Sequence, residues 1–374
     1  MKIKKFAFIV HPVNRKDFLN FYPFFKYLPF LVKRYNFKDI ARKFSSKKFI
    51  EIKIKLPQDK SLSSTNMAQD LLWGIGIGVP LFPEDFVRLE ESIVLDKIKQ
   101  ACLLAEKKGA GIIGLGGFTS IVGDEGRVLA DQINAAITSG NTYTAYLALE
   151  GIFKAVKLLE KDLSSCTACV VGATGDIGSI CSKVLAKKVK RIILVARNLP
   201  RLEEFSQKIK ALNSASVEFT KYTQEAVKES EIILTATSSL TTLIEPQQLK
   251  SGSIVCDVAI PPNIAREIYK IRQDVLVFEG GKAKIPFSDK IKNRLWQSFF
   301  PEGIIFGCLA ETILLALEGY FSDFSIGRGK ITEDKLNFIA ALSQKYGFSL
   351  APFKCGDKIL DEKAIKLIKE NIKR

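Results

Sequence analysis

One glycine-rich stretch constrains this chain more than any other. Residues 168–171 form a short apolar run, and Gly172-Ala-Thr-Gly-Asp-Ile-Gly178 follows it with glycines at three-residue spacing. A helical pattern over 179–185 and a second apolar run over 191–196 come next. This order predicts a βαβ unit, because glycines let the backbone approach a pyrophosphate and the N-terminus of the following helix offers free N–H groups. The sequence therefore predicts a dinucleotide-binding domain.

The end of the second strand indicates which dinucleotide binds. NAD calls for Asp or Glu there to bind the ribose hydroxyl, but this chain has Arg197 and Asn198, with no carboxylate before Glu203. Because arginine suits a 2′-phosphate, we expect NADPH as the cofactor. The expected cofactor-binding residues are Gly172, Ala173, Thr174, Gly175, Asp176, Ile177, Arg197, Asn198 and, after a later strand, Thr237.

Strand and helix patterns alternate after this unit. Further strands are expected at 217–220, 232–239, 253–262 and 275–281. Such alternation is typical of a parallel sheet with helices on both faces. The sequence therefore predicts an α/β protein built on a Rossmann-type doubly wound parallel sheet, with right-handed crossovers.

The chain is long enough for more than one domain. Residues 1–160 combine strand patterns with a helix or helix pair over 83–108, and we expect them to form an α/β N-terminal substrate domain. Residues 161–290 are expected to be the NADP-binding Rossmann domain. Residues 291–374 change to helical patterns, and this C-terminal segment is expected to pack back on the N-terminal domain.

Composition limits the partners and the compartment. The net charge is +16, but the lysines are scattered and no nucleic-acid motif accompanies them, so no nucleic acid is expected. An acidic protein, an anionic membrane surface or a generally lysine-rich composition would each account for the charge. Seven cysteines, an odd number, and no evident signal peptide predict a cytoplasmic protein with free thiols. A single histidine and no metal-type cysteine spacing predict no metal site.

Two features near the N-terminus are each open to two interpretations. Residues 18–35 are dense in Phe, Tyr, Leu and Lys, with two prolines that interrupt any single helix. They either touch lipid as a peripheral contact or line an acyl chain, or they are an insertion packed on the domain. His11, directly after the first expected strand, either contacts substrate or is a buried structural residue.

Cys308 is the best candidate to hold a substrate covalently. A helix is expected over 301–320. It would place Gly303 and Gly307 on one helical face, next to Cys308, and leave that face without side chains at these two positions. A thiolate is a competent nucleophile for thioester formation. Glu311, one turn further on, either serves as a base or raises the thiol pKa. Hydroxyl and amide donors for a developing oxyanion are expected from two polar loops, at Thr119, Ser120, Asn141 and Thr144.

Several motifs together resemble the long-chain acyl-acyl-carrier-protein reductases best known from cyanobacteria. The resemblance runs from about residue 83 to about residue 347. It rests on Gly114-Leu-Gly-Gly-Phe-Thr-Ser-Ile121, Gly140-Asn-Thr-Tyr-Thr-Ala-Tyr146, Val170-Val-Gly-Ala-Thr-Gly-Asp-Ile-Gly-Ser179, Ala196-Arg-Asn198, Cys308-Leu-Ala-Glu311, Leu317-Glu-Gly319 and Phe324-Ser-Ile-Gly-Arg328. Tyr143 is a departure, since the family carries histidine there.

The resemblance implies a two-step reaction. A fatty acyl group passes from the thiol of an acyl carrier protein to the cysteine that matches Cys308, and NADPH reduces the resulting thioester to a fatty aldehyde. Acyl carrier proteins are acidic, which suits a basic chain. The resemblance implies Cys308 as the catalytic cysteine, and Glu311, Ser120 and Thr144 complete the expected catalytic set from their positions in the sequence.

Two other functions remain open from the sequence. A shikimate- or amino-acid-dehydrogenase-like enzyme would transfer a hydride to a small polar substrate without a covalent step. Such a site usually needs a lysine–aspartate pair, and Asp257 at an expected strand end has no lysine evidently beside it. A non-enzymatic NADP-binding sensor would bind the cofactor without reducing any thioester.

Overall fold

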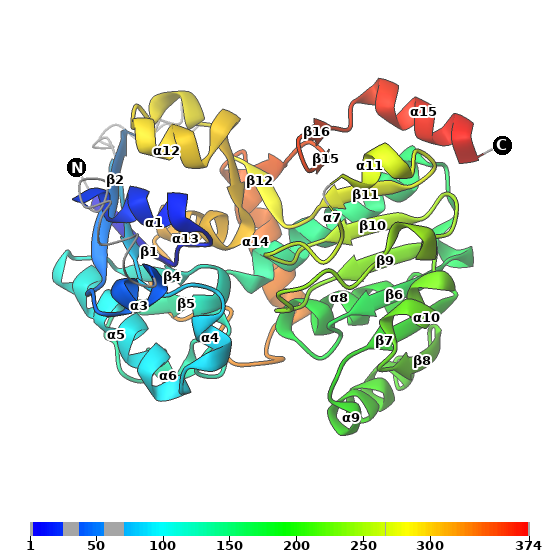
Figure 1. Cartoon of the computed structure of the whole chain (residues 1–374), viewed down its shortest axis with the longest axis horizontal. Coiled ribbons are helices and arrows are strands. Elements are labelled where there is room, and N and C mark those ends of the chain that lie inside the picture. The colour runs from blue at the N-terminus through cyan, green and yellow to red at the C-terminus, as the bar shows by residue number, and fades with distance from the viewer. Residues whose placement is uncertain (1–2, 25–36, 56–70, 266, 373–374) are drawn as a thin grey trace, which may run out of the picture. The chain divides into compact units, whose positions relative to one another are not determined.

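A computed structural model describes residues 3–24, 37–55, 71–265 and 267–372 of the chain (Figure 1). Residues 25–36 of the aromatic stretch lie outside these ranges. The chain forms two compact units. The first unit comprises residues 1–140, 284–327 and 341–349, and the second comprises 141–283, 328–340 and 350–374. Within the described ranges, no helix has both the length and the apolar character needed to cross a membrane.

The first unit is built on a five-stranded sheet. Its strand order is β2-β3-β1-β4-β5, and every neighbouring pair is parallel except β2 with β3. The strands are β1 (Ile3–Val10), β2 (Lys47–Lys55), β3 (Leu71–Gly78), β4 (Ile112–Leu115) and β5 (Ala136–Thr138). The helices of this part of the chain are α1 (Arg15–Phe21), α3 (Phe37–Arg42), α4 (Asp85–Arg88), α5 (Glu91–Lys107), α6 (Arg127–Ala130), α12 (Arg294–Phe299) and α13 (Gly307–Glu318). The stretch 83–108 is thus a helix pair, as predicted.

Side chains alternate between the two faces of this sheet. Ala7 and Ile9 of β1 join the apolar core formed with α5. On the opposite face, a Cβ added to Gly114 of β4 would lie 1.9 Å from Oγ1 of Thr312 in α13. Helix α13 therefore packs directly on the backbone of β4, a close approach that glycine permits.

The structure corrects the expected helix over 301–320. Residues Pro301–Gly303 form a 3₁₀ turn, Ile304–Phe306 form the short strand β13, and α13 begins only at Gly307. The left-handed Gly303 (φ +73°) ends the turn, and two β-branched isoleucines then favour extended backbone. Gly303 and Gly307 consequently share no helical face, and Cys308 lies in the first turn of α13.

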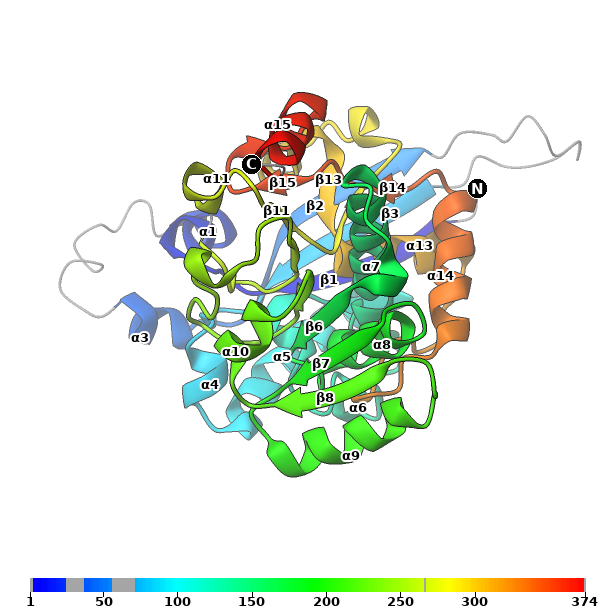
Figure 2. The ribbon, with the colours of Figure 1, turned by 90° about the vertical axis from the view of Figure 1, so that its right-hand side faces the viewer.

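The second unit contains a six-stranded, wholly parallel sheet. Its strand order is β11-β10-β9-β6-β7-β8, and Figure 2 shows β6, β7 and β8 side by side. The strands are β6 (Thr167–Val171), β7 (Arg191–Val195), β8 (Ser216–Thr220), β9 (Ile232–Thr235), β10 (Ile254–Asp257) and β11 (Leu276–Glu279). This confirms the predicted α/β fold with a doubly wound parallel sheet.

Helices connect these strands and fill the core of the second unit. They are α7 (Asn141–Leu158), α8 (Asp176–Ala186), α9 (Leu199–Lys210), α10 (Thr223–Lys228), α11 (Ile268–Ile271) and α15 (Glu362–Ile372). Ala148 and Ile152 of α7 pack in one apolar cluster with Ile180 of α8. The remaining elements are α14 (Glu333–Lys345) and the short strands β12 (Lys282–Lys284), β14 (Ser349–Leu350), β15 (Lys354–Cys355) and β16 (Lys358–Ile359).

Candidate functional site

The turn after β6 has no room for side chains at two of its three glycines. A Cβ on Gly172 would lie 2.3 Å from the carbonyl oxygen of Ala236, and one on Gly178 would lie 2.1 Å from the carbonyl oxygen of Gly172. Gly172 also has a left-handed backbone (φ +88°). The glycines therefore permit a tight turn and the close packing of α8 behind it.

The same turn presents its outer side for binding. The N–H groups of Gly172 and Ala173 both donate to the carbonyl of Val195 (2.8 and 3.0 Å), which fixes the start of the turn. Thr174, Gly175 and Ile177 are partly exposed where α8 begins. A partly exposed glycine turn at the N-terminus of an eleven-residue helix fits the pyrophosphate of a dinucleotide.

Asp176 differs from its neighbours because its carboxylate is buried and hydrogen-bonded within the second unit. Its Oδ2 accepts from Nδ2 of Asn141 (3.3 Å), at the start of α7, and its Oδ1 accepts from the N–H of Gly329. The side chain thus ties the start of α8 to two other segments. Any contact of Asp176 with a dinucleotide would use its backbone.

The carboxyl end of β7 carries two arginines. Arg197 is exposed, and Oδ1 of Asn198 caps α9 by accepting from the N–H of Arg201 (3.1 Å). Arg201, which sequence reasoning missed, donates from Nη2 to the carbonyl of Thr174 in the glycine-rich turn (2.9 Å). Its position in the first turn of α9, four residues after Arg197, is the signal that could have identified it.

Thr237 lies in the loop that follows β9, and Asp257 is the last residue of β10. Thr237 donates from Oγ1 to Oδ1 of Asn263 (2.8 Å). The carboxylate of Asp257 accepts from Oγ1 of Thr235 and from the N–H groups of Ala259, Asn263 and Ile264. Burial raises the pKa of Asp257, and these donors oppose the rise. Asp257 therefore holds the loop after β10 in shape.

Cys308, in the first unit, is the one cysteine of the seven that is not buried. Desolvation of the sulfur raises its pKa to about 11. Backbone N–H groups of Leu309, Gly117 and Cys308 itself lower the pKa of the thiol and so oppose that rise, whereas the charge of Glu311 adds to it. Because the N–H groups lie on α13 and on the turn after β4, two separate elements point donors at one sulfur.

Gly140 lies against the backbone of Cys308. A Cβ on Gly140 would be 2.2 Å from Cα and 2.3 Å from Cβ of Cys308, closer than any real contact of this kind. Gly140 is also left-handed (φ +75°), a conformation that L side chains rarely adopt. The position of Cys308 therefore depends on the absence of a side chain at residue 140.

Glu311 is fully buried one turn after Cys308. Its Oε1 accepts hydrogen bonds from Oγ1 of Thr138 and from Oγ of Ser325 (2.7 Å). Thr138 ends β5, and Ser325 has a left-handed backbone (φ +52°). Glu311 thus connects α13 to the end of β5 and to the chain after α13.

The predicted hydroxyl donors make contacts of their own. Ser120 and Thr119 donate to the carbonyls of Gly117 (2.8 Å) and Gly116 (2.9 Å), inside the 3₁₀ turn Gly117–Ser120. Thr144 is a nearly buried residue of α7, in the second unit, and its Cγ2 would lie 2.7 Å from a Cβ on Gly281. The first unit therefore brings Cys308, Glu311 and the Ser120 turn together, and the predicted cofactor residues share the second unit.

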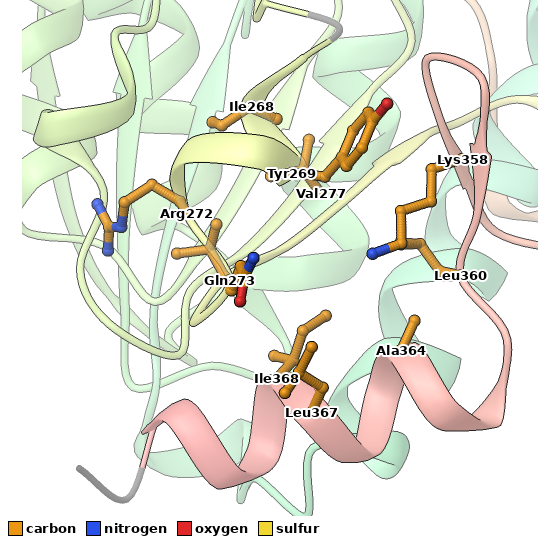
Figure 3. Close-up of a pocket in the computed structure, with 11 residues that line it drawn as sticks. Ile268, Tyr269, Arg272, Gln273, Val277, Lys358, Leu360, Ala364, Leu367 and Ile368 are labelled. Atoms are coloured by element: carbon orange, nitrogen blue, oxygen red, sulfur yellow. The ribbon is translucent and has the colours of Figure 1, made fainter.

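A separate pocket lies between α11 and α15 of the second unit (Figure 3). Its lining is mostly apolar, with the cations Arg272 and Lys358 at its edge. None of the residues predicted to bind cofactor or substrate lines it. Across the described part of the chain, no group of three or more His, Cys, Asp or Glu residues could hold a metal ion.

A parallel Rossmann-type sheet with a glycine-rich turn after its first strand defines an NAD(P)-dependent oxidoreductase, and comparison with known proteins agrees. The family model for shikimate / quinate 5-dehydrogenase matches residues 154–278. The chain belongs to the family of the long-chain acyl-[acyl-carrier-protein] reductase. The Synechococcus elongatus protein of that name is 32% identical over 268 residues, which cover 67% of this chain and 75% of that protein.

More distant similarities are to reductases and dehydrogenases. The glutamyl-tRNA reductase of Actinobacillus succinogenes is 25% identical over 299 residues, covering 76% of this chain and 67% of that protein. Among solved structures, quinate dehydrogenase from Corynebacterium glutamicum in complex with NAD is 11% identical, with a TM-score of 0.35 over 70% of this chain and 82% of that one.

Proposed function

We propose that this enzyme reduces a long-chain fatty acyl thioester, carried by an acyl carrier protein, to a fatty aldehyde with NADPH. The observation that carries the proposal is Cys308, the one cysteine of seven that is not buried, whose thiol pKa is lowered by backbone N–H groups from α13 and from Gly117. The family relationship supports the same reaction, since the Synechococcus relative is named for it.

In the first step, the Cys308 thiolate attacks the carbonyl carbon of the thioester. A new C–S bond forms, the bond to the carrier's thiol breaks, and that thiolate leaves and takes up a proton. Desolvation raises the pKa of the Cys308 thiol, and its placement in the first turn of the twelve-residue helix α13 opposes that rise, because the N-terminal end of a helix stabilises negative charge. The acyl group is then held on the sulfur of Cys308.

The N–H groups of Gly117 and Leu309 are the donors that we assign to developing negative charge beside Cys308. Both lower the pKa of the thiol and so favour negative charge on the sulfur, and backbone donors cost no reorganisation when charge develops. Ser120 and Thr119 use their hydroxyl hydrogens within the turn that carries Gly117, so we give them the role of holding it. We propose Glu311, one turn after Cys308, as the base that accepts the thiol proton before the attack.

NADPH, when bound, supplies the hydride that reduces the acyl carbon. The two-electron reduction breaks the C–S bond to Cys308, releases the aldehyde and restores the thiolate. The turn at Gly172–Gly178 is proposed to hold the pyrophosphate, which is supported by its tight glycine backbone at the start of α8. Arg197 and Arg201 are proposed to bind the 2′-phosphate that distinguishes NADPH from NADH.

Acyl carrier proteins suit the charge of this chain. They are acidic, and a net charge of +16 would attract them at long range and speed encounter. The peripheral membrane contact expected from residues 18–35 stays a prediction, since most of that stretch lies outside the described residues.

Replacing Arg197 with alanine tests the cofactor. We expect the KM for NADPH to rise about tenfold to a hundredfold, because a lost charge-assisted hydrogen bond costs about 1.5–3 kcal/mol, while the KM for NADH changes little. Steady-state kinetics with both cofactors measure this. Equal effects on the two KM values would contradict the assignment. Lys208→Ala, in the helix α9 that follows Arg197 and ion-paired to Glu204, is the control and should change neither value.

The reaction itself is tested by NADPH oxidation with acyl-acyl-carrier-protein and acyl-coenzyme A side by side, with the aldehyde detected by gas chromatography. We expect aldehyde from the carrier-bound substrate at a higher kcat/KM. The shikimate-dehydrogenase-like alternative predicts oxidation with a small hydroxy or keto acid instead. The match to the shikimate / quinate dehydrogenase model keeps this alternative open, but the carboxylate of Asp257 is engaged by four donors of its own unit, which argues against a catalytic role for that residue.

A further inference from the structure

His11 is the only histidine of the chain, and it lies directly after β1 in the first unit. It is 7% exposed and packs between two rings, with its centroid 4.9 Å from that of Phe86 and 5.6 Å from that of Phe118. This burial favours the structural interpretation over direct contact with substrate.

The ring of His11 is hydrogen-bonded on both nitrogens. The N–H of Phe118 donates to Nε2 (3.1 Å), so the proton of the neutral ring belongs on Nδ1, which lies 3.2 Å from the carbonyl oxygen of Pro12. Burial lowers the pKa of His11 to about 4, against weaker opposing effects of that carbonyl and of the charges of Asp85 and Glu84. The ring is therefore a neutral acceptor at pH 7.

Three successive N–H groups of the turn after β4 are engaged in sequence. Gly116 donates to the carbonyl of Ile9 (2.8 Å) and Phe118 to Nε2 of His11 (3.1 Å), and the N–H of Gly117 between them lowers the pKa of the Cys308 thiol. Ile9 belongs to β1 and His11 directly follows that strand, so these two partners hold the turn on either side of the Gly117 peptide. Gly117 is left-handed (φ +59°), and a Cβ there would lie 2.9 Å from Nε2 of His11.

We propose that His11 is a positioning residue for Cys308: its Nε2 fixes the peptide after Gly117, and thereby aims the Gly117 N–H at the sulfur. The inference deepens the proposed function, on which the importance of Cys308 rests. Its effect reaches the thiol through the backbone, so His11 needs no contact with substrate.

The test uses the full chain and three variants. In His11→Gln, the side-chain oxygen can take the place of Nε2 and accept from Phe118, whereas in His11→Asn the oxygen is too short to reach, and His11→Phe offers no acceptor. Phe86→Leu is the packing control, since it loosens the contact with the ring and keeps both hydrogen bonds. Thermal unfolding and NADPH binding check that each variant is folded.

The measurement is the rate of iodoacetamide alkylation of Cys308 from pH 7 to 10.5, followed on its peptide by mass spectrometry, with Cys308→Ala as background. We expect His11→Asn and His11→Phe to react about tenfold more slowly at pH 8, since a hydrogen bond to a charged group is lost or weakened. The rise of the alkylation rate with pH should occur at higher pH in His11→Asn and His11→Phe. The alkylation rate of His11→Gln should stay within about threefold of the wild-type rate, and Phe86→Leu should keep the wild-type pH profile.

A wild-type profile for His11→Asn overturns the proposal, and so does an equal loss in His11→Gln and His11→Asn, because a packing role makes no distinction between the two amides. Alkylation requires neither acyl substrate nor cofactor. A chain that shows the expected profiles and yet forms no aldehyde therefore contradicts the proposed function alone.

Discussion

Cys308→Ala should abolish both acyl labelling of the protein and formation of aldehyde. The reason is chemical: the acyl group has no other attachment point, because the remaining six cysteines are buried. Removing a covalent nucleophile typically costs a factor of about 10⁴ or more in kcat. Intact-mass spectrometry after incubation with acyl-acyl-carrier-protein, and a parallel aldehyde assay, measure the two effects.

Cys102→Ala is the matched control for that experiment. Cys102 is a fully buried cysteine of α5 in the same unit, and burial raises its pKa to about 12. Its replacement should lower the melting temperature by a few degrees at most and leave labelling intact. Aldehyde formation by Cys308→Ala at a rate near that of the wild type would exclude covalent catalysis through this residue.

Gly140→Ala should have the second largest effect. The added methyl group would lie 2.2 Å from Cα of Cys308, so the start of α13 must move away from it. The left-handed backbone alone costs about 1–2 kcal/mol, and overpacking adds about 1–3 kcal/mol. We expect a lower melting temperature together with a loss of Cys308 reactivity of tenfold or more, measured by calorimetry and by iodoacetamide alkylation.

Gly319→Ala separates the two causes. Gly319 ends α13 with nearly the same backbone (φ +77°), but a Cβ there would meet nothing within 4 Å. This variant should have a lower melting temperature, because of the left-handed backbone, and should keep the wild-type alkylation rate of Cys308. If the two alanine variants lost the same reactivity, the contact between Gly140 and Cys308 would not be what positions the thiol.

Local patterns predicted the fold well where a signal is contained in a few neighbouring residues. The turn at Gly172–Gly178 combines glycine spacing with a strand on one side and a helix on the other, and all of this lies within 30 residues. Strand β5 (Ala136–Thr138) was missed because three residues are too few to show a period.

The surroundings of Cys308 could not be predicted in the same way. The expected helix over 301–320 ignored the left-handed Gly303, whose backbone conformation no composition rule reveals. The N–H of Gly117 is about 190 positions from Cys308 in the chain, and backbone donors leave no residue-type signature. Arg201 was overlooked because its partner is a carbonyl, that of Thr174, rather than a charged side chain.

The use of backbone N–H groups at Cys308 has a consequence for mutational scanning. A scan that truncates polar side chains to alanine leaves those donors untouched and detects them only indirectly, through His11 and Ser120, which hold the turn. Sensitivity should instead concentrate at residues that set main-chain geometry, namely His11, Gly117 and Gly140. The reactivity of this thiol thus depends on main-chain conformation, which the types of the neighbouring polar side chains do not reveal.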